Sequence, residues 1–239
     1  MGKTTVSIII AGAAVGVVLT LALFFATQDD VKSSFYGNRV SANVASSSLL
    51  LIQRIPIPNV NGRIDHMAVD ITGREKLLSV AEIENDSLDI IDLNIGKRVH
   101  TIDNDLSEPQ GVLFVPEFDR IFVSNGQDGS VNIFDAKSFS LDKRIQLPSS
   151  DADNIRYDRN GVIYVGYGQG ALGIISATDG GIVGNIKLPA HQESFQIEQT
   201  RSPGGQNNRI FVNVPGSNSI VVVDKQKGIA LTTNNLVIT

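Results

Sequence analysis

The chain has 239 residues, a formal net charge of −5, and neither cysteine nor tryptophan. The absence of cysteine excludes a disulfide framework and thiolate chemistry, so the fold must rest on its apolar core. Nucleic-acid binding needs clustered Lys and Arg, whereas these residues are scattered along this sequence. We therefore expect no nucleic acid among the partners.

The amino terminus carries an uncharged apolar run, residues 6–26, with Lys3 before it. About 20 such residues span a bilayer as a helix, and a positive charge before the run places the amino end in the cytoplasm. We predict an uncleaved signal anchor, a transmembrane helix over residues 1–27; a cleaved secretory signal is the alternative. Residues 28–48 are predicted to be a polar, flexible linker. Either way, the rest of the chain lies outside the cytoplasmic membrane.

From residue 49 onward one pattern occurs four times: an apolar strand, a turn rich in Asn, Gly and Asp, then an alternating strand. The copies are residues 76–92, 120–135, 161–176 and 209–224. A repeat of about 40 residues made of short strands is typical of propeller blades. The fold class predicted is therefore all-β, a β-propeller of four-stranded blades over residues 49–239.

We place the blades at about residues 50–98, 99–140, 144–183 and 184–231, with a fifth beginning at 232–239. In the first blade, the four strands are expected at residues 52–57, 66–71, 76–81 and 87–93. Turn residues such as Asp128-Gly129 and Asn160-Gly161 support this division, because they provide positions with positive φ.

Two short motifs recur in these units. Residues 121–125 (IFVSN), 163–167 (IYVGY) and 210–214 (IFVNV) fill the first slot, and residues 88–92, 131–135 and 220–224 fill the second. They resemble the YVTN β-propeller repeats, named for a Tyr-Val-Thr-Asn strand followed by a turn and a Val-x-Val-Ile-Asp strand. The resemblance covers about 180 residues and implies the fold, but fold alone does not supply a function.

Propellers of this kind usually have seven or so blades, whereas this chain supplies four and part of a fifth. An open arc would expose two blade faces and a strand edge. Three interpretations follow: a truncated reading frame, which we favour, half of a ring shared by a homodimer, or a ring closed by four blades.

Polar residues gather where the second strand of each unit is expected to begin, near the mouth of the central channel. Alignment on the ends of these strands matches three acidic residues, and other polar residues lie beside or just before them. The candidates for a metal or ligand site are Asp65, His66, Glu108, Asp153, Asn154, His191 and Glu193. Carboxylates from several blades would suit Ca²⁺, which takes six to eight oxygen ligands. The alternative is that these side chains cap turns.

No catalytic constellation accompanies these residues, since the sequence contains no G-x-S-x-G motif. Asn85 begins the one N-x-S/T sequon and is a glycosylation candidate. We predict a membrane-tethered, extracytoplasmic binding or scaffold module for an unidentified protein or small molecule. The first alternative is a Ca²⁺-dependent hydrolase, because the acidic cluster resembles in arrangement the metal site of propeller lactonases. The second is a propeller that binds a redox cofactor.

Overall fold

A computed structural model describes residues 50–73, 76–199 and 208–235, with side chains described to residue 229. Within these residues the chain forms four four-stranded antiparallel sheets, each with its strands in chain order. The sheets all lie in the compact unit Arg54–Thr239. This all-β fold is consistent with the predicted propeller.

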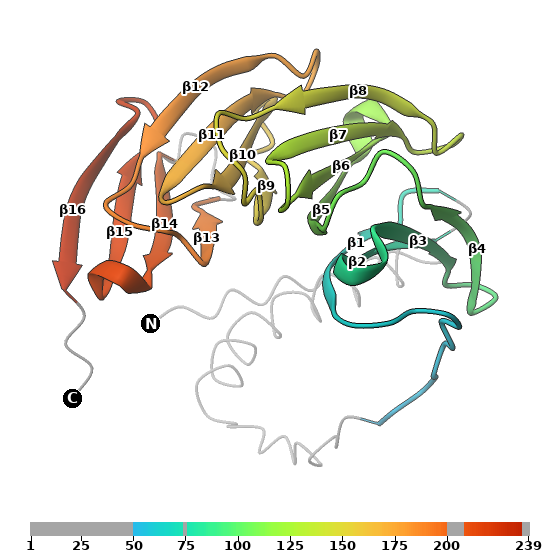
Figure 1. Cartoon of the computed structure of the whole chain (residues 1–239). Coiled ribbons are helices and arrows are strands. Elements are labelled where there is room, and N and C mark those ends of the chain that lie inside the picture. The colour runs from blue at the N-terminus through green and yellow to red at the C-terminus, as the bar shows by residue number, and fades with distance from the viewer. Residues whose placement is uncertain (1–49, 74–75, 200–207, 236–239) are drawn as a thin grey trace, which may run out of the picture. The chain divides into compact units, whose positions relative to one another are not determined.

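Sheet 1 contains β1 (Ile64–Asp70), β2 (Leu77–Glu82), β3 (Ser87–Asp92) and β4 (Lys97–Ile102). Sheet 2 contains β5 (Pro109–Val115), β6 (Arg120–Asn125), β7 (Ser130–Asp135) and β8 (Leu141–Gln146). Sheet 3 contains β9 (Ile155–Tyr157), β10 (Val162–Tyr167), β11 (Ala171–Ser176) and β12 (Ile182–Lys187). Sheet 4 contains β13 (Ser194–Ile197), β14 (Arg209–Val214), β15 (Ser219–Asp224) and β16 (Ile229–Asn235). Figure 1 shows the first strands on the inner side and the fourth strands on the outer side.

The sheet boundaries differ from the predicted blade boundaries by one strand. Residues 52–57, predicted to be the first strand, form no strand, and the predicted second strand corresponds to β1. The strand at Lys97–Ile102, placed at the start of the second blade, pairs with β3 as the last strand of sheet 1. Residues 232–235 likewise belong to β16 and complete sheet 4 instead of beginning a fifth blade.

Short polar turns link the third and fourth strands. The aspartate that ends β3, β7 and β15 accepts a hydrogen bond from the backbone N–H two residues later. For Asp92 the bond from Asn94 is 2.7 Å, and for Asp135 the bond from Lys137 is 2.9 Å. This side-chain cap satisfies a turn donor and favours the reversal. The closing aspartates of the repeat therefore have a structural role.

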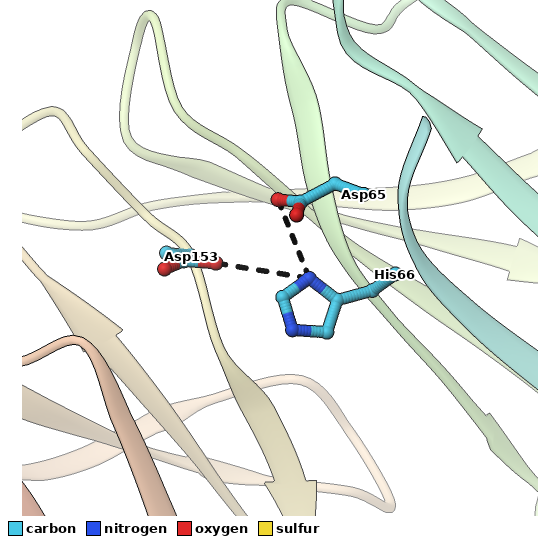
Figure 2. A group of neighbouring side chains, drawn as sticks. All are labelled: Asp65, His66 and Asp153. Atoms are coloured by element: carbon cyan, nitrogen blue, oxygen red, sulfur yellow. Dashed lines mark ion pairs between the residues drawn. The ribbon is translucent and has the colours of Figure 1, made fainter. Parts of the chain in front are cut away.

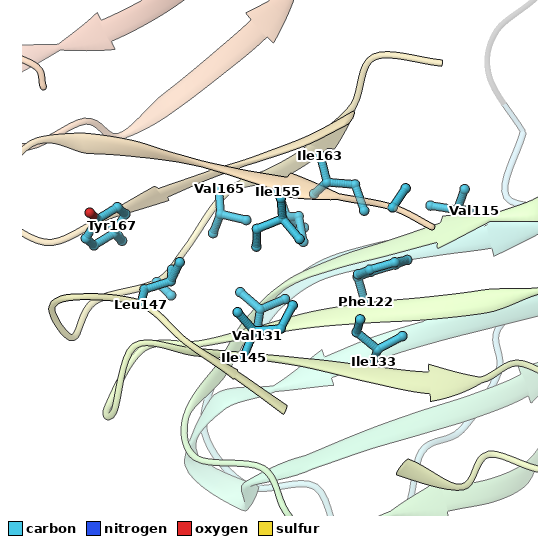
Figure 3. Close-up of a cluster of buried hydrophobic side chains, with 13 residues drawn as sticks. Val115, Phe122, Val131, Ile133, Ile145, Leu147, Ile155, Ile163, Val165 and Tyr167 are labelled. Atoms are coloured by element: carbon cyan, nitrogen blue, oxygen red, sulfur yellow. The ribbon is translucent and has the colours of Figure 1, made fainter. Parts of the chain in front are cut away.

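Apolar side chains fill the spaces between consecutive sheets. Phe122, Val131 and Ile133 of sheet 2 pack against Ile155 and Ile163 of sheet 3, as Figure 3 shows, and all are almost fully buried. Equivalent clusters join sheets 1 and 2 and sheets 3 and 4. Burial on both sides of a sheet explains why the middle strands are apolar on both faces.

No helix among the described residues is long and apolar enough to cross a membrane. The predicted anchor at residues 1–27 and the predicted linker at 28–48 lie outside the described residues.

Candidate functional site

The polar cluster begins at an irregularity in β1. The register between β1 and β2 shifts between Ile64 and Met67, so Asp65 and His66 form a bulge on the inner strand. A bulge leaves residues out of the ladder and re-aims their side chains. Both side chains are about three-quarters buried.

The third member, Asp153, comes from the segment that enters β9 in sheet 3. Its backbone passes so close to β5 that a Cβ at Gly111 would lie 2.2 Å from the carbonyl oxygen of Asp153. The hydroxyl of Ser124 bridges the two segments, because it donates to the carbonyl of Asp153 and accepts from the N–H of Gly111. The missing side chain at Gly111 therefore allows sheets 1 and 3 to contribute to one cluster across the edge of sheet 2.

The three side chains meet around the Nδ1 atom of His66, as Figure 2 shows. Nδ1 lies 3.4 Å from Asp65 Oδ2 and 3.9 Å from Asp153 Oδ1. One candidate ligand atom from each residue lies within 4.8 Å of the others. His66 Nδ1 and Asp153 Oδ1 are buried atoms without a hydrogen-bond partner. Two polar atoms thus face each other with neither satisfied, which is unusual for buried groups.

Burial raises the pKa of the Asp153 carboxyl above its usual value. The charge of His66 and the hydrogen bond from Asn154 act in the opposite direction, whereas the charges of Asp65 and Asp151 raise the pKa further. A positive charge beside Asp153 would therefore stabilise its ionised form.

Asn154 holds the second oxygen of this carboxylate. Its amide donates to Asp153 Oδ2 at 3.3 Å and to the carbonyl of Glu193 at 2.7 Å. Arg156 donates to the amide oxygen of Asn154 at 3.0 Å, which fixes the direction of the amide. The sequence pattern did not identify Arg156, Gly111 or Ser124, because their contributions depend on contacts between sheets.

The remaining predicted site residues lie apart from this group. The side chains of Glu108 and Glu193 are exposed, and the backbone N–H of Glu108 donates to Asp86 at 2.6 Å. His191 forms a separate pair with Asp151, at 3.2 Å, and its Nδ1 lies 3.0 Å from the carbonyl of Gly168.

Asn85, the glycosylation candidate, lies at the end of the short helix Ile83–Asn85. Its amide nitrogen donates to Glu82 Oε2 at 3.1 Å. The atom that would carry a glycan is therefore already used as a hydrogen-bond donor.

A hollow of about 360 Å³ lies between sheets 1 and 2, and none of the three residues of the polar cluster lines it. Its polar groups are already paired. Asp70 accepts from both the N–H and the hydroxyl of Thr72, and Lys137 pairs with Asp119 at 2.5 Å. Size alone is therefore a weaker indication of a site than the unpaired atoms of the cluster.

The two terminal sheet faces form a second feature. In each sheet, we call the face that packs against the preceding sheet the leading face, and the opposite face the trailing face. In sheet 1, the leading face is the one whose residues occupy the same strand positions as the leading-face residues of the other sheets. On the leading face, Met67 of β1 is equivalent to Val112, Ile155 and Phe195, since each pairs with the same position of its second strand. Met67 is 59% exposed, whereas the three equivalent residues are at most 5% exposed.

The trailing face of sheet 4 shows the same contrast. Phe211 is equivalent to Phe122 and Tyr164, which are buried against the following sheets. Phe211 and its neighbours Ile220 and Val222 are only partly buried. Side chains of the kind that join the other sheets are thus exposed in β1 of sheet 1 and partly accessible to solvent on the trailing face of sheet 4.

Comparison with known proteins shows no family, but it does find solved structures of similar fold. No family model matches the sequence, and no curated protein matches it. Among solved structures, a chain of Kuenenia stuttgartiensis hydrazine synthase superposes with a TM-score of 0.57 at 17% identity. The match covers 66% of this chain and 45% of that chain. At this identity the likeness shows the fold alone.

Proposed function

We propose that this chain is a YVTN-type β-propeller module, tethered outside the cytoplasmic membrane by residues 6–26, that binds through its terminal sheet faces. The uncharged run at the amino terminus supports the tether. Four consecutive four-stranded sheets, packed face to face, support the propeller as part of a larger ring.

The observation that carries this proposal is that apolar residues equivalent to buried ones are exposed in β1 of sheet 1 and only partly buried on the trailing face of sheet 4. In the interior of the fold, a leading face packs on the trailing face of the sheet before it. Met67 and Val69 lie on the leading face of sheet 1, and Phe211 lies on the trailing face of sheet 4. Large exposed apolar patches mark interaction sites.

The partner we propose is a second copy of this chain. In such a dimer, Met67 and Val69 on the leading face of one copy would pack against the trailing face of sheet 4 in the other copy. On sheet 1 the contact would be confined to β1, because Val80 and Ile91 on the same face are already buried. The two copies would then share one ring through face-to-face packing.

The solution mass of the full-length chain in a mild detergent tests this proposal. Light scattering, corrected for bound detergent, is expected to give twice the mass of the chain for the native protein and a monomer for Phe211→Asp. Ile95→Asp is the matched control, since Ile95 is exposed on a turn away from both faces. A native monomer, or a dimer that Phe211→Asp leaves intact, would contradict the proposal.

A metal-dependent hydrolase is the second candidate function, favoured by the convergence of His66 and Asp153 from different sheets. Lactone hydrolysis that requires an added divalent cation and is lost in His66→Ala would support it. Turnover that survives both EDTA and His66→Ala would exclude this site as its source.

A further inference from the structure

We propose that Asp65, His66 and Asp153 form a binding site for one divalent cation of the Zn²⁺ class, Zn²⁺ or a similar first-row transition metal. This inference is independent of the proposed association through the sheet faces. It requires only the three side chains and the approach of Asp153 to β5.

The donor set determines the class of cation. One imidazole nitrogen and two carboxylate oxygens are ligands that Zn²⁺ and its neighbours in the first transition row accept. Ca²⁺ takes six to eight oxygens, and the carboxylates of Glu108 and Glu193 that were expected to supply more of them are exposed and apart from the group. The structure therefore favours a nitrogen-accepting metal over the Ca²⁺ predicted from the sequence.

The spacing of the candidate ligand atoms fits a single small ion. Two ligands each about 2.0–2.1 Å from a tetrahedral Zn²⁺ lie about 3.4 Å from each other. His66 Nδ1 is 3.4 Å from Asp65 Oδ2 and 3.9 Å from Asp153 Oδ1. The three candidate ligand atoms lie within 4.8 Å of one another, so the side chains would have to close by at most about 1.4 Å per pair to reach the spacing of a shared Zn²⁺.

The unsatisfied atoms are the second observation. His66 Nδ1 and Asp153 Oδ1 are buried and lack hydrogen-bond partners, although a group in this state costs free energy. An ion bound between them would satisfy both, and it would supply a positive charge beside the partly buried carboxylates. The other oxygen of Asp153 accepts from Asn154, which orients the carboxylate in the way that surrounding partners orient metal ligands.

Titration of Zn²⁺ into the EDTA-treated full-length chain tests the proposal by calorimetry. We expect one saturable site per chain, together with an increase in melting temperature, because a ligand that binds the folded state stabilises it. Co²⁺ in place of Zn²⁺ is expected to give a saturable visible absorption band. His66→Gln and Asp153→Asn are each expected to weaken binding at least about tenfold.

His191→Gln is the matched control, because His191 also lies beside an aspartate but outside the group. The His191→Gln protein should bind Zn²⁺ with the affinity of the native chain. Asp153→Asn replaces a carboxyl group whose ionised form is disfavoured by burial, so the variant should fold, and circular dichroism can confirm this. Three results would overturn the proposal: no saturable binding of Zn²⁺ or Co²⁺, binding unchanged in His66→Gln, or tighter binding of Ca²⁺ than of Zn²⁺. None of these results depends on the oligomeric state.

Discussion

The leading face of sheet 1 and the trailing face of sheet 4 occupy the two ends of the repeat, but they differ in chemistry. Sheet 4 keeps the apolar residues of the interior faces, with Phe211, Ile220 and Val222 partly exposed. Sheet 1 instead buries two carboxyl groups, Glu82 and Asp89, on its leading face. The leading face of sheet 1 therefore combines buried carboxyl groups with the exposed apolar side chains of Met67 and Val69, whereas Phe211, Ile220 and Val222 make the trailing face of sheet 4 apolar.

The carboxyl groups of sheet 1 accept hydrogen bonds from neighbouring side chains. Asp89 accepts from Arg98 at 2.8 Å and from Thr101 at 2.5 Å. Glu82 accepts from Ser87 at 2.7 Å and from Asn85. At the positions of Glu82 and Asp89, sheet 4 has Val214 and Val221, which are buried in its core. The comparison shows that a repeat can keep its backbone while one of its faces changes from apolar packing to buried hydrogen bonding.

The largest expected effect is a difference in the loss of stability between a substitution at a buried face and one at the partly exposed trailing face of sheet 4. Phe122→Ala should lower the free energy of unfolding by about 3–5 kcal/mol, because Phe122 is fully buried between sheets 2 and 3. Phe211→Ala, at the equivalent position of sheet 4, should cost about 1 kcal/mol or less in the monomer. Urea denaturation at a concentration that keeps the chain monomeric measures both. Equal losses would mean that the face of sheet 4 is covered as the others are.

The second prediction removes the centre of the polar network. Asp89→Ala should lower the free energy of unfolding by about 2–3 kcal/mol, since it removes a fully buried carboxylate that accepts hydrogen bonds from Arg98 and Thr101. Asp142→Ala is the control, because Asp142 is exposed and lies 3.7 Å from Arg120. That change should cost about 0.5 kcal/mol. Losses of similar size in both variants would show that the Asp89 network contributes no more than a surface pair.

The repeat itself was predictable because strand alternation and turn residues are local. The paired strands at Arg120–Asn125 and Ser130–Asp135 lie where the motifs placed them. The grouping of strands into sheets was not predictable to within one strand, because a turn signal marks a reversal without saying which strand begins a sheet. The strand at Lys97–Ile102 illustrates this: its residues are compatible with either neighbour, and only the pairing with β3 decides.

The polar cluster was predictable only in part, for a similar reason. Asp65, His66 and Asp153 were candidates by their position in the repeat, but Glu193 at the corresponding position is exposed. The difference depends on Gly111 and Ser124, which bring Asp153 toward sheet 1. The pair Glu82 and Asp89 was missed altogether, because a carboxylate in an alternating strand is normally interpreted as solvent-facing.

The smallest expected effect concerns the protonation of Glu82. Burial raises the pKa of Glu82 above its usual 4.5, and its contact with Asp89 raises it further, against the hydrogen bonds from Ser87 and Asn85. A raised folded-state pKa means that the stabilising contribution of protonated Glu82 is complete below pH 4.5 and is lost as the pH rises through the folded value. The first sheet therefore becomes less stable toward neutral pH because of this group.

Glu82→Gln should remove that dependence. The amide oxygen can keep the bonds from Ser87 and Asn85, and the amide NH₂ replaces Oε1, an oxygen that lacks a hydrogen-bond donor. We expect the variant to gain about 1 kcal/mol over the native chain at pH 7 and nothing at pH 4, measured by urea denaturation at both values. A gain of the same size at both pH values would arise from packing, and a loss at pH 7 would mean that ionised Glu82 is needed. A gain confined to neutral pH would show that the polar face of sheet 1 carries an electrostatic cost that the apolar face of sheet 4 avoids.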